Sequence, residues 1–265
     1  MQLKDRRKEK ILLFLISIVS LSVFFVVWQL VTDEWKVFQS YLLPSPLKIL
    51  NTFIGKFTNP NPDGSTLPQH IWASVKVALS GFFFGSVFGV PAGIVMAWNR
   101  KADRFLRPVF DLLKPIPPIA WIPIMIMFFG IGLLAKAAVI FMGAAIPCLI
   151  NSYTGIKQTS QVHIWVARTF GAKRRKILFK VAIPTALPFI FTGLRISLAN
   201  SWIALVAAEL LASTDGLGFM IQMGRTFART DIVIVGMLTI GTIGAVSALL
   251  LQRVQDKFVR RRRKL

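Results

Sequence analysis

The sequence has little that would serve a soluble catalyst or a metalloprotein: one cysteine, two histidines, and 11 acidic residues against 32 basic ones. Cys148 has no second cysteine to pair with, which excludes an internal disulfide and most cysteine-based metal sites. Because Cys148 lies in an apolar run, we expect a packed core thiol. The chain also lacks a G-x-x-x-x-G-K-[ST] loop, since Gly55-Lys56-Phe57 has neither the earlier glycine nor the hydroxyl residue. We therefore expect no ATP hydrolysis by this chain.

Charged residues are scarce as well, at 16% of the chain, while hydrophobic residues make up 54% and the mean hydropathy is +0.62. Such a composition is typical of a membrane protein. In a soluble protein the net charge of +21 would suggest nucleic acid. Here the basic residues cluster between apolar runs, so membrane orientation explains them and no nucleic-acid partner is predicted. The basic run 260–264 is better suited to anionic lipid headgroups than to RNA.

Five uncharged apolar runs are long enough to cross about 30 Å of hydrocarbon. They are residues 11–31, 77–98, 115–135, 137–156 and 232–252. A sixth stretch, 184–211, is apolar but carries Arg195 and Glu209. The first run is longer than the apolar core of a signal peptide, roughly 7–15 residues, and no small-residue cleavage site follows it, so we expect an anchor. The sequence predicts an all-α integral membrane protein with about six transmembrane helices, forming one domain over residues 1–265.

The distribution of Lys and Arg predicts the orientation, because cytoplasmic loops carry the excess. With the N-terminus inside, the inside segments hold 24 of the 32 basic residues and the outside segments hold six. The inside segments are 1–10, 99–114, 156–181 and 252–265; the outside segments are 32–70, 129–136 and 212–230. Both termini are thus predicted to be cytoplasmic, as a basic N-terminus (1–10) and a basic tail (253–265). The external loop 32–70 is predicted to contain a short amphipathic helix, Leu47–Phe57, followed by a surface turn at 59–64.

The cytoplasmic loop 157–183 carries the most information about function. Val162–Phe170 suits a short helix, and Gly171 suits its C-cap, where a left-handed backbone costs glycine least. Arg174–Val181 suits a second helix, which Pro184 is expected to stop before the next span. A helix-Gly-helix element of this kind fits a groove on a soluble partner. It equally fits an interfacial helix that rests on lipid.

Several blocks of the chain resemble the permease subunits of bacterial binding-protein-dependent ABC importers. The loop motif of that family has Glu-Ala-Ala, then Gly after three intervening residues, and a pattern ending in Pro. The matching residues are Ala167, Gly171, Val181, Ile183 and Pro184, whereas Trp165 and Val166 stand in place of the Glu and the first Ala. Further blocks are similar to taurine, aliphatic sulfonate and nitrate permeases: 112–124, 128–132, 187–195, 202–209 and 216–218. The resemblance covers roughly residues 44–256.

The resemblance implies a type I ABC importer permease fold with cytoplasmic coupling helices in a bacterial plasma (inner) membrane. The residues expected to couple to an ATPase are Ala167, Arg168, Thr169, Gly171, Ala172 and Pro184. The implied partners are an ATPase dimer that holds ATP and magnesium, a second permease subunit (the same chain or a different one), an external substrate-binding protein and membrane lipid. No cofactor is expected on this chain. The implied substrate is a small anion, with taurine or another sulfonate favoured over nitrate, bicarbonate, a thiamine precursor or an aromatic acid.

The polar residues of the sixth stretch are the candidates for a translocation path, because charges inside a membrane usually face a cavity or a partner. Arg195 and Glu209 would lie about 21 Å apart on one helix, so each needs its own partner. We expect the path to include Arg195, Asn200, Ser201, Trp202 and Glu209. The alternative is that Arg195 extends toward the inner surface and Glu209 makes a structural hydrogen bond.

No catalytic or metal site is expected. His70 and His163 are predicted on opposite sides of the membrane with no second ligand near either, and no Ser/His/Asp arrangement lies within reach. A channel or a secondary carrier is the rival class, since six spans with basic ends would serve it too. A membrane enzyme is less favoured than either. A carrier, however, has no need of the helix-Gly-helix element.

Overall fold

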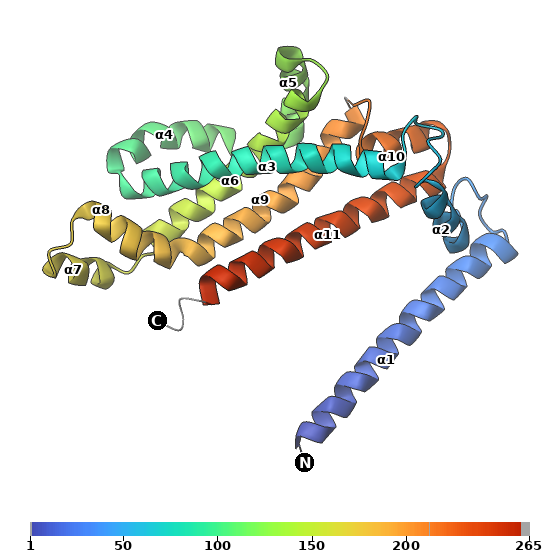
Figure 1. Ribbon diagram of the computed structural model, residues 1–265, viewed down its shortest axis with the longest axis horizontal. Coiled ribbons are helices and arrows are strands. Elements are labelled where there is room, and N and C mark those ends of the chain that lie inside the picture. Colours follow the sequence, from blue (N-terminus) through green and yellow to red (C-terminus); the bar gives the residue numbers. More distant parts are fainter. Residues whose placement is uncertain (1, 212, 261–265) are drawn as a thin grey trace. The chain divides into compact units, whose positions relative to one another are not determined.

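The computed structural model describes residues 2–211 and 213–260, and within these residues every regular element is helical (Figure 1). In this part of the chain, five helical stretches are long and apolar enough to cross a membrane: Leu12–Glu34, Leu67–Trp98, Leu133–Lys157, Arg174–Leu211 and Thr230–Lys257. They correspond to α1 (Gln2–Gln29), α3 (Leu67–Trp98), α6 (Leu133–Lys157), α9 (Ile183–Leu211) and α11 (Thr230–Arg260). The prediction of an all-α membrane protein is confirmed.

The span predicted over residues 115–135 differs from what the structure shows. Among the described residues, the only further candidate is the pair Arg100–Leu113 (α4) and Pro118–Phe129, which is apolar and long enough when taken together and is bent by 89°. The bounds of the span predicted over 115–135 are therefore wrong, because the apolar pair begins at Arg100 and ends at Phe129. Prolines break the hydrogen-bond ladder at its start, and α5 (Ile122–Phe129) ends at Gly130, whose φ is +71°. The remaining eight-residue helix is about 12 Å long, too short to cross a bilayer.

The chain divides into two compact units. The first comprises Met1–Pro68 and Met220–Met237, and the second comprises Gln69–Phe219 and Leu238–Leu265. Residues 261–265 of the predicted basic tail and Met1 of the predicted basic N-terminus lie outside the described residues.

In the second unit, α3 packs against α6 along a row of glycines. The row recurs every four residues and so lies on one face of α3: Gly81, Gly85, Gly89 and Gly93. A Cβ at Gly85 would lie 2.6 Å from the Ala144 Cβ, and one at Gly89 would lie 2.9 Å from the Cys148 Cβ. Small residues let helices approach closely in a membrane, where lipid is as apolar as the helix surface. Cys148 itself is fully buried, as the sequence predicted.

Replacing Gly85 with leucine is expected to force α3 and α6 apart and lower the melting temperature of the purified protein. Overpacking a close interface costs about 1–3 kcal/mol. The matched control is Gly241→Leu on α11, where a Cβ meets no atom within 4 Å. Equal melting temperatures for the two variants would contradict the close packing of α3 on α6.

The core of the second unit lies where α6 packs along α9. Ile140 of α6 and Leu205 of α9 have no exposed surface, and Trp202 of α9 is 7% exposed. This packing fixes the orientation of α9, and with it the side of the helix on which the polar residues of 184–211 lie.

In the first unit, α2 (Pro46–Gly55) confirms the predicted short helix with a slight shift of its bounds. The Ser45 hydroxyl accepts a hydrogen bond from the Lys48 amide at 3.4 Å, which caps the helix start. The turn that follows is exposed, as predicted, but it encloses Lys56, whose buried amine donates to Asp63. A buried lysine requires such a counterion.

Candidate functional site

The predicted helix-Gly-helix element is present in the loop 157–183, which the charge distribution predicts to be cytoplasmic. α7 (Gln161–Thr169) ends at Gly171, whose φ is +71°. The Gly171 amide donates to Arg168 O at 2.8 Å and the Ala172 amide donates to Ala167 O at 3.0 Å. These two bonds form a Schellman motif, which satisfies the last carbonyls of α7. The predicted C-cap at Gly171 is confirmed.

The second helix of the loop does not stop at Pro184, and that prediction is wrong. α8 (Arg174–Ile177) continues through a π-helical turn, Leu178–Ala182, directly into α9. In the π turn the Ile183 amide bonds to Leu178 O, one residue further back than in an α-helix. This shift accommodates Pro184, which has no amide hydrogen to donate. The second helix of the loop and the apolar stretch 184–211 thus form one continuous helical element, Arg174–Leu211.

The loop exposes apolar side chains beside basic ones. Trp165 is 60% exposed, Phe170 is 86% exposed and Phe179 is 67% exposed, whereas Ile164 and Ile177 point inward and are buried. The predicted coupling residues Arg168, Thr169 and Gly171 are exposed, and Ala167, Ala172 and Pro184 are partly buried. A cluster of exposed aromatic residues is typical of an interaction surface.

Arg174 anchors the loop to the end of α3, a contact that sequence reasoning missed. Its guanidinium donates to Trp98 O at 2.6 Å and lies 5.8 Å from the centre of the Trp98 ring. Such cation–π contacts favour arginine over lysine because the guanidinium also hydrogen-bonds. The run of four consecutive basic residues, 173–176, gave no sign of which one would do this.

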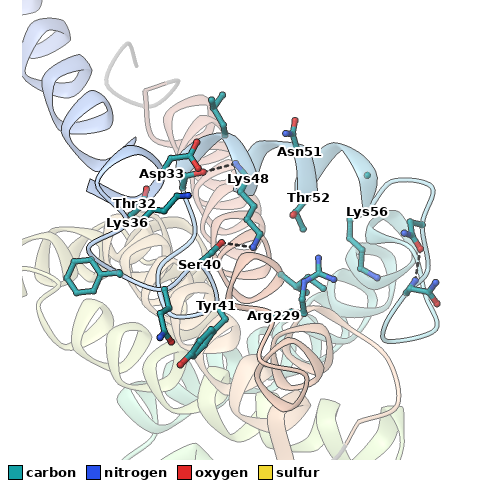
Figure 2. Close-up of a pocket in the computed structure, with 18 residues that line it drawn as sticks. Thr32, Asp33, Lys36, Ser40, Tyr41, Lys48, Asn51, Thr52, Lys56 and Arg229 are labelled. Atoms are coloured by element: carbon teal, nitrogen blue, oxygen red, sulfur yellow. Dashed lines mark hydrogen bonds between the residues drawn. The ribbon is translucent and has the colours of Figure 1, made fainter. Parts of the chain in front are cut away.

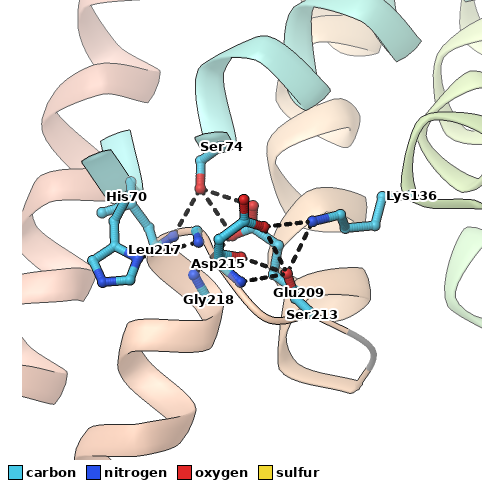
Figure 3. A network of polar contacts seen from close by, with 9 residues as sticks. His70, Ser74, Lys136, Glu209, Ser213, Asp215, Leu217 and Gly218 are labelled. Carbon is cyan, nitrogen blue, oxygen red and sulfur yellow. Dashed lines mark hydrogen bonds and ion pairs between the residues drawn. The ribbon is translucent and has the colours of Figure 1, made fainter. Parts of the chain in front are cut away.

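A network of polar contacts centres on Glu209, which is 1% exposed (Figure 3). The Ser74 hydroxyl donates to the Glu209 carboxylate, lying 2.8 and 2.9 Å from its two oxygens, and the Gly218 amide donates to it at 2.8 Å. Ser74 in turn accepts from the Leu217 amide at 2.8 Å, and His70 Nδ1 accepts from the Gly216 amide at 3.1 Å. The carboxylate therefore joins α9, α3 and the turn at 213–218.

Glycine is required at position 216 for two reasons. Its φ is +106°, and a Cβ there would lie within 2.7 Å of Glu209 Oε2. The sequence block at 216–218 thus serves to present backbone amides to buried side chains. Neither Ser74 nor His70 was expected in this network, because their apolar neighbours in sequence carry no signal for a contact across the fold.

Lys136 lies beside this network on α6. Its amine lies 2.9 Å from the Ser213 hydroxyl and 3.1 Å from Asp215 Oδ1 (Figure 3). The Lys136 side chain is 6% exposed and the Asp215 side chain is 55% exposed. Sequence reasoning counted Lys136 only as an outside loop charge, because a single lysine between two apolar runs does not reveal a partner far along the chain.

The predicted path residues have separate partners. Arg195 donates to the Gln255 side chain, and Trp202 Nε1 donates to the Ser247 hydroxyl at 3.1 Å. Ser201 is buried and donates to Ser197 O at 2.8 Å. Asn200 is partly buried. Glu209 has the hydrogen bonds that the structural alternative expects, and a role for these residues in a path stays a prediction.

The first unit carries an open hollow of about 1040 Å³ (Figure 2). Its lining includes four basic residues, Lys36, Lys48, Lys56 and Arg229. The Lys48 amine donates to the Ser40 hydroxyl at 2.8 Å. Arg229 pairs with Asp231 at 2.7 Å, and this hydrogen bond raises the pKa of Arg229, which stays cationic. The hollow lies on segments that the charge distribution predicts outside.

Residues 89–264 match the family model described as "Binding-protein-dependent transport system inner membrane component". The taurine transport system permease protein of Escherichia coli K12 is 37% identical over 245 residues, 91% of this chain and 88% of that protein. A putative ABC transporter permease of Methanocaldococcus jannaschii is 37% identical over 94% of this chain and 92% of that protein. The nitrate import permease protein of Synechocystis is 33% identical over 91% and 90%.

Two solved structures have the same fold. An inward-facing MetNI methionine ABC transporter aligns with a TM-score of 0.60 at 24% identity, over 73% of this chain and 94% of that one. An amino acid ABC transporter crystallised with histidines aligns with a TM-score of 0.56 at 16% identity, over 81% and 96%.

Proposed function

Because the chain belongs to the family of binding-protein-dependent transport system inner membrane components, we propose that it forms, with a second copy, the translocation path of an ATP-driven importer for a small anion. The type I importer fold, expected from the sequence, is that of its structural relatives. Taurine or another sulfonate is the favoured substrate, since the taurine permease is similar over 91% of the chain. Nitrate, bicarbonate, a thiamine precursor and an aromatic acid are the alternatives.

The observation that carries the proposal is the continuity of the helix from the cytoplasmic loop to Glu209. Arg174–Leu211 is one helical element, and the Schellman motif at Gly171 fixes α7 at its start. A partner that binds the exposed surface around Trp165 and Phe170 and moves the loop would also move α9, because α8 continues directly into α9. Since packed helices shift between discrete arrangements, such a displacement can open or close a path. This supports a docking role for the loop over a resting place on lipid.

The partners follow from the family, whose members work with an ATPase and a substrate-binding protein. We assign ATP and magnesium to a separate ATPase dimer that docks at the loop through Ala167, Arg168, Thr169, Gly171, Ala172 and Pro184. We assign the external side to the segments that form the basic hollow, where a substrate-binding protein would deliver its anion. Both termini are then cytoplasmic in a bacterial plasma membrane.

The path itself is proposed along α9, at Arg195, Asn200, Ser201, Trp202 and Glu209. The support is the cost of polar and charged side chains in a membrane, which keeps them away from lipid. Asn200 and Arg195 retain exposed surface on this helix, so they are the members of the set that a permeating anion would meet directly. Ser201, Trp202 and Glu209 would shape the path by holding α9 in place.

ATP hydrolysis by the assembled importer is expected to rise about fivefold or more when the binding protein carries the right anion. The assembly contains this chain, its ATPase and its binding protein in lipid nanodiscs, and the rate is compared for taurine-loaded and empty binding protein. The ATPase without this chain is the control and should show no stimulation. A rate that responds to no anion at all would contradict the proposed function, and one that responds to nitrate alone would reassign the substrate.

A further inference from the structure

Lys136 is a buried ammonium group whose counterion is exposed. The Lys136 side chain is 6% exposed, while Asp215, 3.1 Å away, is 55% exposed. A buried cation must keep an anion beside it, because an unpaired charge in a poorly hydrated site is costly. Asp215, by contrast, is already largely hydrated and loses little if it swings into solvent. The two partners of this ion pair are therefore unequal, and only the acid is free to leave.

A cavity of about 410 Å³ opens beside the pair. This volume lies within the range of small-ligand sites, roughly 300–1,000 Å³. The lining includes a second cation, Lys76, together with the side chains of Gln69, Trp72 and Thr214. Trp72 is 70% exposed and supplies an apolar wall. Two ammonium groups and several hydrogen-bonding groups thus face a space that contains one carboxylate, that of Asp215.

We propose that this cavity binds the oxyanion head of a small anion, which displaces the Asp215 carboxylate from Lys136. A sulfonate or comparable oxyanion would accept hydrogen bonds from the Lys136 amine and, once Asp215 moves away, from the Ser213 hydroxyl, which otherwise donates to Asp215. Lys76 supplies the second positive charge at the mouth, and the carbon part of an organic anion packs on Trp72. The inference rests on the proposed function, because it names a place where this chain would bind the transported anion.

Release of Asp215 would alter the hydrogen bonds around Glu209. Asp215 is followed directly by Gly216 and Leu217, whose amides bond to His70 and Ser74. Ser74 in turn holds Glu209 at the end of α9. Exchange of Asp215 for an anion at Lys136 would thus act on the turn that the Glu209 carboxylate holds. The turn is in this way connected to the helical element Arg174–Leu211, which contains Glu209.

Binding of isethionate, 2-hydroxyethanesulfonate, to the purified full-length chain in lipid nanodiscs tests the proposal. Tryptophan fluorescence reports it, and Trp72→Phe identifies the part of the signal that arises at the cavity. Asp215→Asn removes the internal competitor while keeping its shape, so isethionate should bind about threefold to tenfold more tightly. The matched control is Asp103→Asn, which removes an equal charge from the Arg107 pair elsewhere in the same unit and should change nothing.

Lys136→Gln should abolish the Trp72-dependent signal, and Lys136→Arg, which keeps the positive charge, should retain it. This comparison distinguishes the loss of the charge from a failure to fold. Weaker or unchanged binding in Asp215→Asn would overturn the proposal even if Lys136→Gln does not fold. So would a signal that ethylene glycol, which is neutral, reproduces. ATP-driven uptake by the wild-type importer is scored separately. Uptake without tighter binding in Asp215→Asn refutes the anion site alone, whereas tighter binding without uptake refutes the importer alone.

Discussion

Replacing Gly171 with valine is expected to abolish ATP-driven uptake while the membrane helices stay folded. Gly171 has a φ of +71°, and a left-handed backbone costs an ordinary residue about 1–2 kcal/mol and a β-branched one more. A Cβ at this position meets no atom within 4 Å, so the effect comes from the backbone rather than from a clash. The Schellman motif would be lost, and α7 would no longer hold a fixed angle to α8. Uptake into proteoliposomes and copurification with the ATPase measure the outcome.

Two controls separate coupling from general strain. Gly171→Asn should retain most of the uptake, because asparagine tolerates the left-handed conformation. Gly64→Val puts a similar strain (φ +82°) on an exposed turn of the first unit, again with no atom within 4 Å. This variant should copurify with the ATPase as the wild-type chain does. Normal copurification and uptake by Gly171→Val would refute the assigned role of the loop.

Replacing Glu209 with alanine is expected to destabilise the protein and to stop transport. The change leaves the Ser74 hydroxyl and the Gly218 amide buried without their acceptor, at about 1–3 kcal/mol for each group. It also releases the turn at 213–218 from α9. A melting temperature well below that of the wild-type chain and at least tenfold slower uptake, roughly the effect of a lost coupling of 1–2 kcal/mol, are the expected results.

Glu209→Gln and Asn200→Ala distinguish a structural role from a role in the path. The glutamine keeps the shape and one acceptor oxygen, so the variant should fold, with hydrogen bonds about half as strong. Its uptake should fall because the turn is held less firmly. Asn200→Ala should keep the melting temperature and slow the uptake, since this side chain is only partly buried. Unchanged transport in both variants would rule out the path along α9.

Much of the helical framework could be predicted from the sequence. Long apolar runs specify helices because every backbone group must be satisfied inside a membrane, so α1, α3, α6, α9 and α11 are found where hydropathy places them. The bent pair α4 and Pro118–Phe129 could not be predicted in the same way. Hydropathy averages over a long window and takes no account of backbone geometry, so it does not show where the prolines of that run break the helix.

The candidate site was predictable only where a single residue determines the local backbone conformation. Gly171 ends a helix through its own backbone, and local sequence is enough to see that. Ser74 contacts Glu209, and Lys136 contacts Asp215, across the fold. No local pattern tells one polar residue in an apolar run which other it will contact. The π turn at Leu178–Ala182 was missed for a related reason: proline was expected to stop the helix, but a one-residue shift of the hydrogen bonds accommodates it.

The central claim is that ATP drives uptake through this chain. The most direct measurement is the uptake of labelled taurine into proteoliposomes that contain this chain and its ATPase, with the binding protein outside and ATP enclosed. Uptake should require both ATP and the binding protein and should persist when ionophores remove every ion gradient. Uptake that survives without ATP and disappears with the ion gradient would show a secondary carrier and contradict the account.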